Sequence, residues 1–370
     1  MKSRTSTIIS LFALGGFTIP AQIYFLREFM VVFNGNELVI GTTLSLWLLL
    51  TGAGAWLART FPVKTGPRNF ATFLMMLLSV LPVVAIFNLE QWKAYGLLYG
   101  VAPGLWEIFS FTIFAISPFC LLNGYLFILL TGLLRESDSD HAPGRAYAWE
   151  SLGGLLGGAL VNFVLLWHVD TFSALRVSFV FFVVLIFIAN TLGSIRPPSP
   201  VFRPPSAVYL HFILLVLLIL FIFLFPFRRL SLHSQYKEQE ILLDKDTPYG
   251  HIAITKSGEQ LNYYGDGTLL FSSGNTMWNE ESVHYAMLQR DSARNVLMVG
   301  GGISGAIPEV LKYRPLRLDY VEINPVIADL AKKYIGNTRI SNVFVHRADV
   351  RSFLAGEERT YDFCLVNVPE

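Results

Sequence analysis

The stretch NVLMVGGGISG, residues 295–305, decides the fold of the C-terminal part of the chain. Its first five residues predict a short buried strand, and Gly300, Gly302 and Gly305 follow with GxGxxG spacing. A helical pattern begins directly afterwards and extends to Tyr313. A strand before and a helix after are the setting in which such glycines let the backbone approach a ligand. The stretch therefore predicts the first strand of a parallel α/β sheet with a ligand-binding turn behind it.

A second strand is predicted at residues 318–322, and it ends in an acid. Glu322 lies 17 residues beyond Gly305, about where an acid accepts hydrogen bonds from ribose hydroxyls in dinucleotide-binding sheets. The combination predicts a nucleoside ligand held by the glycine loop and Glu322. The alternative is a structural turn followed by an exposed acid at a strand end.

Two further strands are predicted, at residues 343–346 and 361–366. Asp349 follows the first of these and is expected to reach an adenine amino group. A doubly wound sheet normally consists of two halves, and four parallel strands do not provide the second half. The sequence thus predicts a Rossmann-like nucleoside-binding α/β domain over residues 291–370, incomplete at its C-terminal side.

Residues 231–290 have a different pattern. Alternating apolar and polar residues over 247–271, interrupted by two glycine-containing turns, predict consecutive β-hairpins. A short helix is expected at residues 280–290. We therefore expect a small antiparallel region in front of the α/β domain.

The first 230 residues are far more apolar than a soluble domain. The chain has 53% hydrophobic residues and a mean hydropathy of +0.50, which excludes a single ordinary soluble domain. Seven runs have about the length that a bilayer requires, at residues 7–33, 38–58, 70–89, 108–134, 151–168, 172–192 and 207–227. They predict a multi-pass α-helical domain over residues 1–230, in contact with the lipid bilayer of the cell (inner) membrane.

Basic residues between the runs indicate an orientation for the helices. If every run crosses once, one side holds most of these residues and is then cytoplasmic. They are Lys2, Arg4, Arg59, Lys64, Arg68, Arg135, Arg145, Arg196 and Arg203. An odd number of spans puts Arg228 and Arg229 on the other side, against the rule. A re-entrant piece within residues 89–134 would remove the conflict. The side of the C-terminal domain therefore stays open.

The fifth run opens with small residues. Residues 151–159, SLGGLLGGA, contain overlapping small-xxx-small pairs. Such pairs let two helix backbones approach closely, so this run is predicted to pack tightly against a neighbouring helix.

Charge and cysteine content exclude several classes of protein. A net charge of +1 gives no general attraction to nucleic acid, so no nucleic-acid partner is expected. The two cysteines, Cys120 and Cys364, lie far apart and form no metal-binding pattern. No magnesium, haem or zinc site is expected.

At these residues the sequence resembles the spermidine synthase (polyamine aminopropyltransferase) family, in its membrane-fused, multi-span members. The resemblance rests on the glycine loop and on four further segments, at residues 144–154, 248–252, 280–288 and 321–325. It implies a Rossmann-like, S-adenosylmethionine-dependent methyltransferase-like fold. A homo-oligomer is compatible with this assignment.

The resemblance also implies a reaction. An amine nitrogen attacks the propyl carbon next to the sulfonium of decarboxylated S-adenosylmethionine, and methylthioadenosine leaves. Decarboxylated S-adenosylmethionine is thus the expected co-substrate and a polyamine the expected acceptor. Glu281, His284 and Tyr285 match positions expected to bind the amine substrate.

Two positions depart from the family. Ile303 stands where the glycine loop normally carries an acid, and Asn367 stands where the fourth strand normally ends in one. Asparagine cannot take a proton near neutral pH. Glu370 retains the next acidic position, so Asn367 and Glu370 are the candidate catalytic residues.

Three functions remain open. The first is a membrane-bound aminopropyltransferase, and the second is a catalytically lapsed membrane protein that binds or senses an adenosyl ligand. The third is a transporter or membrane assembly partner with an accessory soluble domain. Turnover, binding without turnover, and amine flux across vesicles distinguish them.

Overall fold

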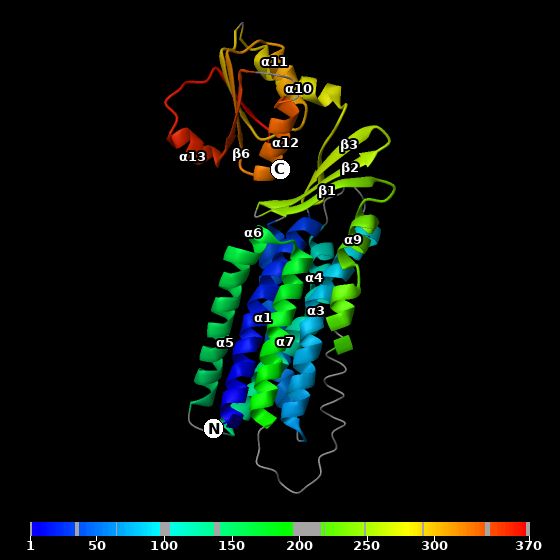
Figure 1. Ribbon diagram of the computed structural model, residues 1–370, viewed down its shortest axis with the longest axis vertical. Coiled ribbons are helices and arrows are strands. Elements are labelled where there is room, and N and C mark those ends of the chain that lie inside the picture. The colour runs from blue at the N-terminus through cyan, green and yellow to red at the C-terminus, as the bar shows by residue number, and fades with distance from the viewer. Residues whose placement is uncertain are drawn as a thin grey trace. The chain divides into compact units, whose positions relative to one another are not determined.

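The computed structural model describes residues 2–33, 37–63, 65–96, 104–136, 141–194, 216–217, 219–247, 249–290, 292–336 and 341–367. The chain separates into two units, residues 1–237 and 238–370 (Figure 1). The predicted further division at residue 290 stays a prediction.

The first unit is helical. Among the described residues, six helices are long and apolar enough to cross a membrane, which agrees with six of the seven predicted runs. The seventh run, residues 207–227, lies largely outside the described residues. The helices are α1 (Lys2–Val32), α2 (Leu38–Thr60), α3 (Pro67–Gly96), α4 (Leu105–Arg135), α5 (Ala142–Leu160), the π-helix η1 (Val161–Leu165), α6 (Leu166–His168), α7 (Thr171–Ser194) and α9 (Phe227–Gln235).

The fifth run differs from its predicted extent. The helix starts at Ala142 rather than Ser151. Pro143 lies in its first turn, where backbone N–H groups have no partner within the helix, so the N–H that proline lacks costs no hydrogen bond. Helix α4 is continuous from Leu105 to Arg135, so the described residues show no re-entrant break there.

Helices α1 and α5 pack backbone against backbone. A Cβ added to Gly153 would lie 2.0 Å from the Phe12 carbonyl oxygen, and one added to Gly157 would lie 2.4 Å from that of Gly16. Only glycine fits at such distances, so the predicted role of the small residues is confirmed. Apolar side chains fill the rest of the bundle core, including the stacked rings of Phe17 and Phe182.

The second unit begins with a four-stranded antiparallel sheet in the order β1-β2-β3-β4. Its strands are β1 (Glu240–Thr247), β2 (Gly250–Ser257), β3 (Gln260–Gly265) and β4 (Thr268–Ser272). The hairpin prediction is confirmed for β2 to β4, but β1 was missed. Asp244, Lys245 and Asp246 hide its pattern, although all three pair in register with β2.

A parallel sheet follows, in the order β7-β6-β5-β8. The elements are α10 (Thr276–Met287), β5 (Asn295–Val299), α11 (Ala306–Leu311), β6 (Arg317–Glu322), α12 (Pro325–Gly336), β7 (Val343–Arg347), α13 (Val350–Ala355) and β8 (Phe363–Val366). Buried Val296, Met298 and Leu318 form its core together with Val283 of α10 and Val310 of α11. The predicted Rossmann-like order of strands and helices is therefore present.

Helix α10 does not have its predicted bounds. It was expected at residues 280–290, but it begins at Thr276, because the Asn275 side chain accepts a hydrogen bond from the Trp278 N–H and caps the first turn. Helix α11 also ends earlier than expected, at Leu311 instead of Tyr313.

Candidate functional site

The candidate site lies where the strand order of the parallel sheet reverses. Strands β6 and β7 extend from one side of β5, and β8 pairs with its other side. Ligands bind at such a switch point, outside the carboxyl ends of the strands. Gly301 follows β5 and Asn367 follows β8 at this point. A Cβ added to Gly301 would lie 2.6 Å from Asn367 Nδ2, so the two residues are in contact.

The glycine loop is shaped by residues with positive φ. Gly300, Gly301 and Gly305 have φ angles of 70°, 69° and 87°, which favour glycine. Gly302 is needed for a different reason, because its Cβ would lie 2.2 Å from the ring of Tyr320. The three predicted glycines therefore form one tight turn between β5 and α11.

Two backbone N–H groups of this loop bond within the protein. Gly300 N–H donates to the Val321 carbonyl at 3.1 Å, and Ser304 N–H donates to the Gly301 carbonyl at 2.9 Å. Ser304 Oγ also donates to the Gly301 carbonyl, at 2.6 Å. A phosphate cradle needs several free N–H groups aimed at the anion. The bonded N–H groups of Gly300 and Ser304 cannot contribute to such a cradle.

Glu322 ends β6 as predicted and is 8% exposed. Its Oε2 accepts a hydrogen bond from the Tyr320 hydroxyl at 2.9 Å, and its Oε1 accepts one from the Asn324 N–H at 2.9 Å. Each carboxylate oxygen has two lone pairs, so both can accept a further bond from a ligand. The structure places Glu322 beside the glycine loop through Tyr320.

Tyr320 is not among the residues predicted from the sequence. Its side chain is fully buried. Burial, followed by the neighbouring Glu322 carboxylate, raises the pKa of Tyr320 well above its ordinary value. The phenol is therefore neutral and can donate its proton to Glu322.

Asp349 has local partners. It caps α13 by accepting a hydrogen bond from the Arg351 N–H at 2.8 Å, and its carboxylate pairs with the Arg351 guanidinium at 3.0 Å. These bonds lower the pKa of Asp349. Its predicted contact with an adenine stays a prediction.

The two positions that depart from the family have different surroundings. Ile303 packs against the apolar core of the α/β domain, as an aliphatic side chain would be expected to do. Asn367 keeps an amide nitrogen that is buried and has no hydrogen-bond partner. Glu370 lies outside the described residues. Of the two candidate catalytic residues, the structure thus places only Asn367 at the switch point.

Asn279 is a second residue that was missed. It is 7% exposed, and its amide oxygen is buried without a partner. A Cβ on Gly305 would lie 2.7 Å from Asn279 Nδ2, so Asn279 touches the glycine loop. Buried polar atoms normally have partners, and an unpartnered one near a candidate site is explained by a ligand or a water molecule. The expected start of α10 at residue 280 excluded Asn279 from consideration.

The three predicted substrate-binding residues do not converge. Glu281 and Tyr285 lie on the exposed face of α10, and Tyr285 is 73% exposed. His284 instead contacts residues of and after α11: its Nδ1 lies 2.6 Å from the Tyr313 hydroxyl and its Nε2 lies 3.0 Å from Glu309 Oε2. Their role in amine binding stays a prediction.

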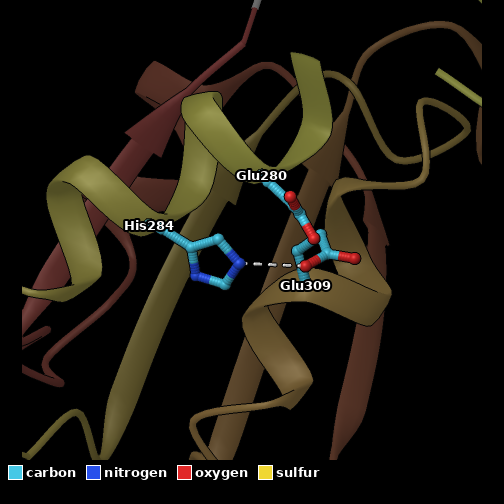
Figure 2. A group of neighbouring side chains, drawn as sticks. All are labelled: Glu280, His284 and Glu309. Carbon is cyan, nitrogen blue, oxygen red and sulfur yellow. Dashed lines mark hydrogen bonds and ion pairs between the residues drawn. The ribbon is translucent and has the colours of Figure 1, made fainter. Parts of the chain in front are cut away.

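Glu280, His284 and Glu309 form a cluster whose possible metal ligand atoms lie within 4.8 Å of one another (Figure 2). The Lys312 ammonium pairs with Glu309 and lies 3.7 Å from Glu280 Oε1. It supplies the positive charge that these carboxylates require. The three side chains could hold a metal ion only with Lys312 displaced.

A parallel sheet with a glycine loop at its switch point and an acid at the end of the next strand defines a Rossmann-like domain. The family model described as spermine/spermidine synthase domain matches residues 276–370. The predicted resemblance to the spermidine synthase family is therefore confirmed.

Individual relatives agree with this family. The polyamine aminopropyltransferase of Oceanobacillus iheyensis is 30% identical over 142 residues, covering 36% of this chain and 28% of the relative. That of Leptospira interrogans is 24% identical over 370 residues, covering 94% of this chain and 67% of the relative. The chain thus spans between about a quarter and two thirds of the length of these curated relatives.

Among solved structures, a spermidine synthase in complex with the transition state analogue AdoDATO is similar at 17% identity and a TM-score of 0.33. The similarity covers 35% of this chain and 47% of that chain.

Proposed function

We propose that this chain is a membrane-bound, spermidine synthase-like protein that transfers an aminopropyl group from decarboxylated S-adenosylmethionine to a polyamine acceptor. The observation that carries the proposal is the juxtaposition of the glycine loop, Glu322 and Asn367 at the switch point of the sheet. Six helices of membrane-spanning length support a multi-pass location in the cell (inner) membrane.

The residues present fit an adenosyl ligand. Glu322 would accept hydrogen bonds from the ribose hydroxyls, and Asp349 would face the adenine amino group. Gly300, Gly302 and Gly305 would let the ligand lie against the backbone.

The transfer itself requires little chemical assistance. The amine lone pair forms a C–N bond with the propyl carbon, the C–S bond breaks, and methylthioadenosine leaves as a neutral thioether. The new ammonium then loses a proton. Alignment of the two substrates and a proton acceptor are what the protein must supply. Asn367 would orient the amine through its amide oxygen, and Glu370 would accept the proton.

An alternative function is adenosyl-ligand binding without turnover. Ile303 favours it, because this side chain packs into the apolar core and leaves the loop without the acid expected there. Asn367 favours it as well, since an amide cannot act as a general base. A lost general base typically lowers the rate by about 10² to 10⁴.

Calorimetric titration of the detergent-purified full chain tests the binding half of the proposal. We expect methylthioadenosine and decarboxylated S-adenosylmethionine to bind, and Glu322→Gln to weaken both about 10- to 100-fold, as for a lost charged hydrogen bond. Asp329→Asn, an exposed acid on α12, is the matched control and should leave binding unchanged. Wild-type protein that binds neither ligand contradicts the proposal.

Turnover then separates the two functions. Release of methylthioadenosine from decarboxylated S-adenosylmethionine in the presence of polyamines supports transfer. Binding without release, with release restored by Asn367→Asp, supports the lapsed form. That substitution keeps the side-chain shape and adds a carboxylate at the same place.

A further inference from the structure

The hydroxyl of Tyr320 links the two halves of the candidate site. It donates to Glu322 Oε2 at 2.9 Å, and the ring that carries it lies directly against Gly302 of the glycine loop. The ring is fully buried and lies so close beneath the loop that Gly302 cannot carry a Cβ. Strand β6 therefore fixes the loop and the acid relative to one another through one side chain.

A second contact holds the same carboxylate from the other side. The Asn324 N–H donates to Glu322 Oε1 at 2.9 Å, and the Asn324 side chain donates to the Thr247 hydroxyl at 3.1 Å. Thr247 ends β1 of the antiparallel sheet. Each carboxylate oxygen of Glu322 accepts one hydrogen bond, so the carboxylate cannot rotate about the Cγ–Cδ bond without breaking one of them.

We propose that Tyr320 is the positioning residue of this site: its hydroxyl orients the Glu322 carboxylate toward the ribose hydroxyls of a nucleoside ligand. The inference rests on the proposed binding of an adenosyl ligand. Two adjacent hydroxyls are best bound by a carboxylate whose plane is already set, because no rotamer freedom is then lost on binding. Tyr320 does not touch the ligand in this arrangement and acts only through Glu322 and the loop.

The test is a thermodynamic cycle in which the Tyr320 hydroxyl and the two ribose hydroxyls of the ligand are removed separately and together. Tyr320→Phe removes one oxygen and keeps the ring that packs under Gly302. Binding of methylthioadenosine and of its 2′,3′-dideoxy analogue is measured by calorimetry on the full chain in detergent. The readout is the ratio of the two dissociation constants, which does not depend on the fraction of folded protein.

We expect wild-type protein to prefer methylthioadenosine over the dideoxy analogue by about 10- to 100-fold, and Tyr320→Phe to reduce this preference by about tenfold. Tyr313→Phe is the matched control, because its hydroxyl bonds His284 in the same domain and does not contact Glu322. It should leave the preference at the wild-type value.

Two outcomes have distinct meanings. An unchanged preference in Tyr320→Phe overturns the positioning role, even if both ligands bind more weakly, because a general loss of stability affects both alike. Failure of wild-type protein to bind methylthioadenosine instead overturns the proposed function on which the inference rests.

Discussion

Asp319 is a buried carboxylate on the face of β6 opposite Tyr320. Asp319 is 0% exposed. It accepts two hydrogen bonds from Arg317, at 2.7 and 2.9 Å, and one from the Tyr361 hydroxyl at 3.1 Å. His346 Nε2 lies 2.6 Å from its Oδ1. This carboxylate thus ties β6 to β7 and to the segment before β8.

Asp319→Asn keeps the shape and removes the charge. Arg317 then loses its bidentate partner while only 25% of its side chain is exposed. Breaking a buried ion pair from one side lowers the free energy of unfolding by about 3–5 kcal/mol. We expect amide hydrogens of β6 to exchange about 100- to 3,000-fold faster, measured by hydrogen–deuterium exchange with mass spectrometry.

The control is an exposed pair on the same domain. Asp329 pairs with Arg347, with side-chain exposures of 55% and 47%, so Asp329→Asn should change the exchange of β6 by less than about fivefold. Exchange in Asp319→Asn that matches this control would refute the view that Asp319 holds the sheet together.

Two further predictions concern pH and the helical unit. Burial raises the pKa of Asp319, but the hydrogen bonds from Arg317 and His346 outweigh it and hold the pKa below its usual range. The stabilisation is therefore complete above about pH 4 and is lost as the pH falls below that value, which an acid titration of β6 amide exchange checks. In the helical unit, Gly157→Leu should lower the melting temperature in detergent because the α1 backbone fills its place, whereas Gly132→Leu should not, since nothing lies within 4 Å of its Cβ position. Equal melting temperatures for the two leucine variants would contradict the close contact of α1 and α5.

Much of the fold follows from local sequence pattern. Strand β5 has the predicted bounds, because the glycine directly after the apolar run marks the residue at which the strand ends. The glycine face of α5 was recognisable for a similar reason, since spacing alone shows which residues share a helix face. Strand β1 was missed because charged residues on both faces remove the alternation on which the prediction depends.

The residues that connect the site could not be found in this way. Tyr320 has the pattern of an ordinary strand residue, and its importance appears only when β5 and β6 pair in register and bring its ring beneath Gly302. Asn279 depends likewise on the packing of α10 against the loop. Glycine spacing and a strand-end acid are local signals, whereas a shared hydrogen bond is a property of the tertiary fold.

The pairing of β8 with β5 also bears on how the protein matures. These strands lie side by side, with Cys364 opposite Leu297, although β6, β7 and three helices separate them along the chain. A contact between residues so far apart in the sequence forms late in folding. Closing the long loop between them costs conformational entropy before the contact stabilises the fold. On the ribosome, the glycine loop emerges several seconds before Asn367 at common synthesis rates. Nascent chains should therefore acquire ligand-binding competence only after β8 docks against β5.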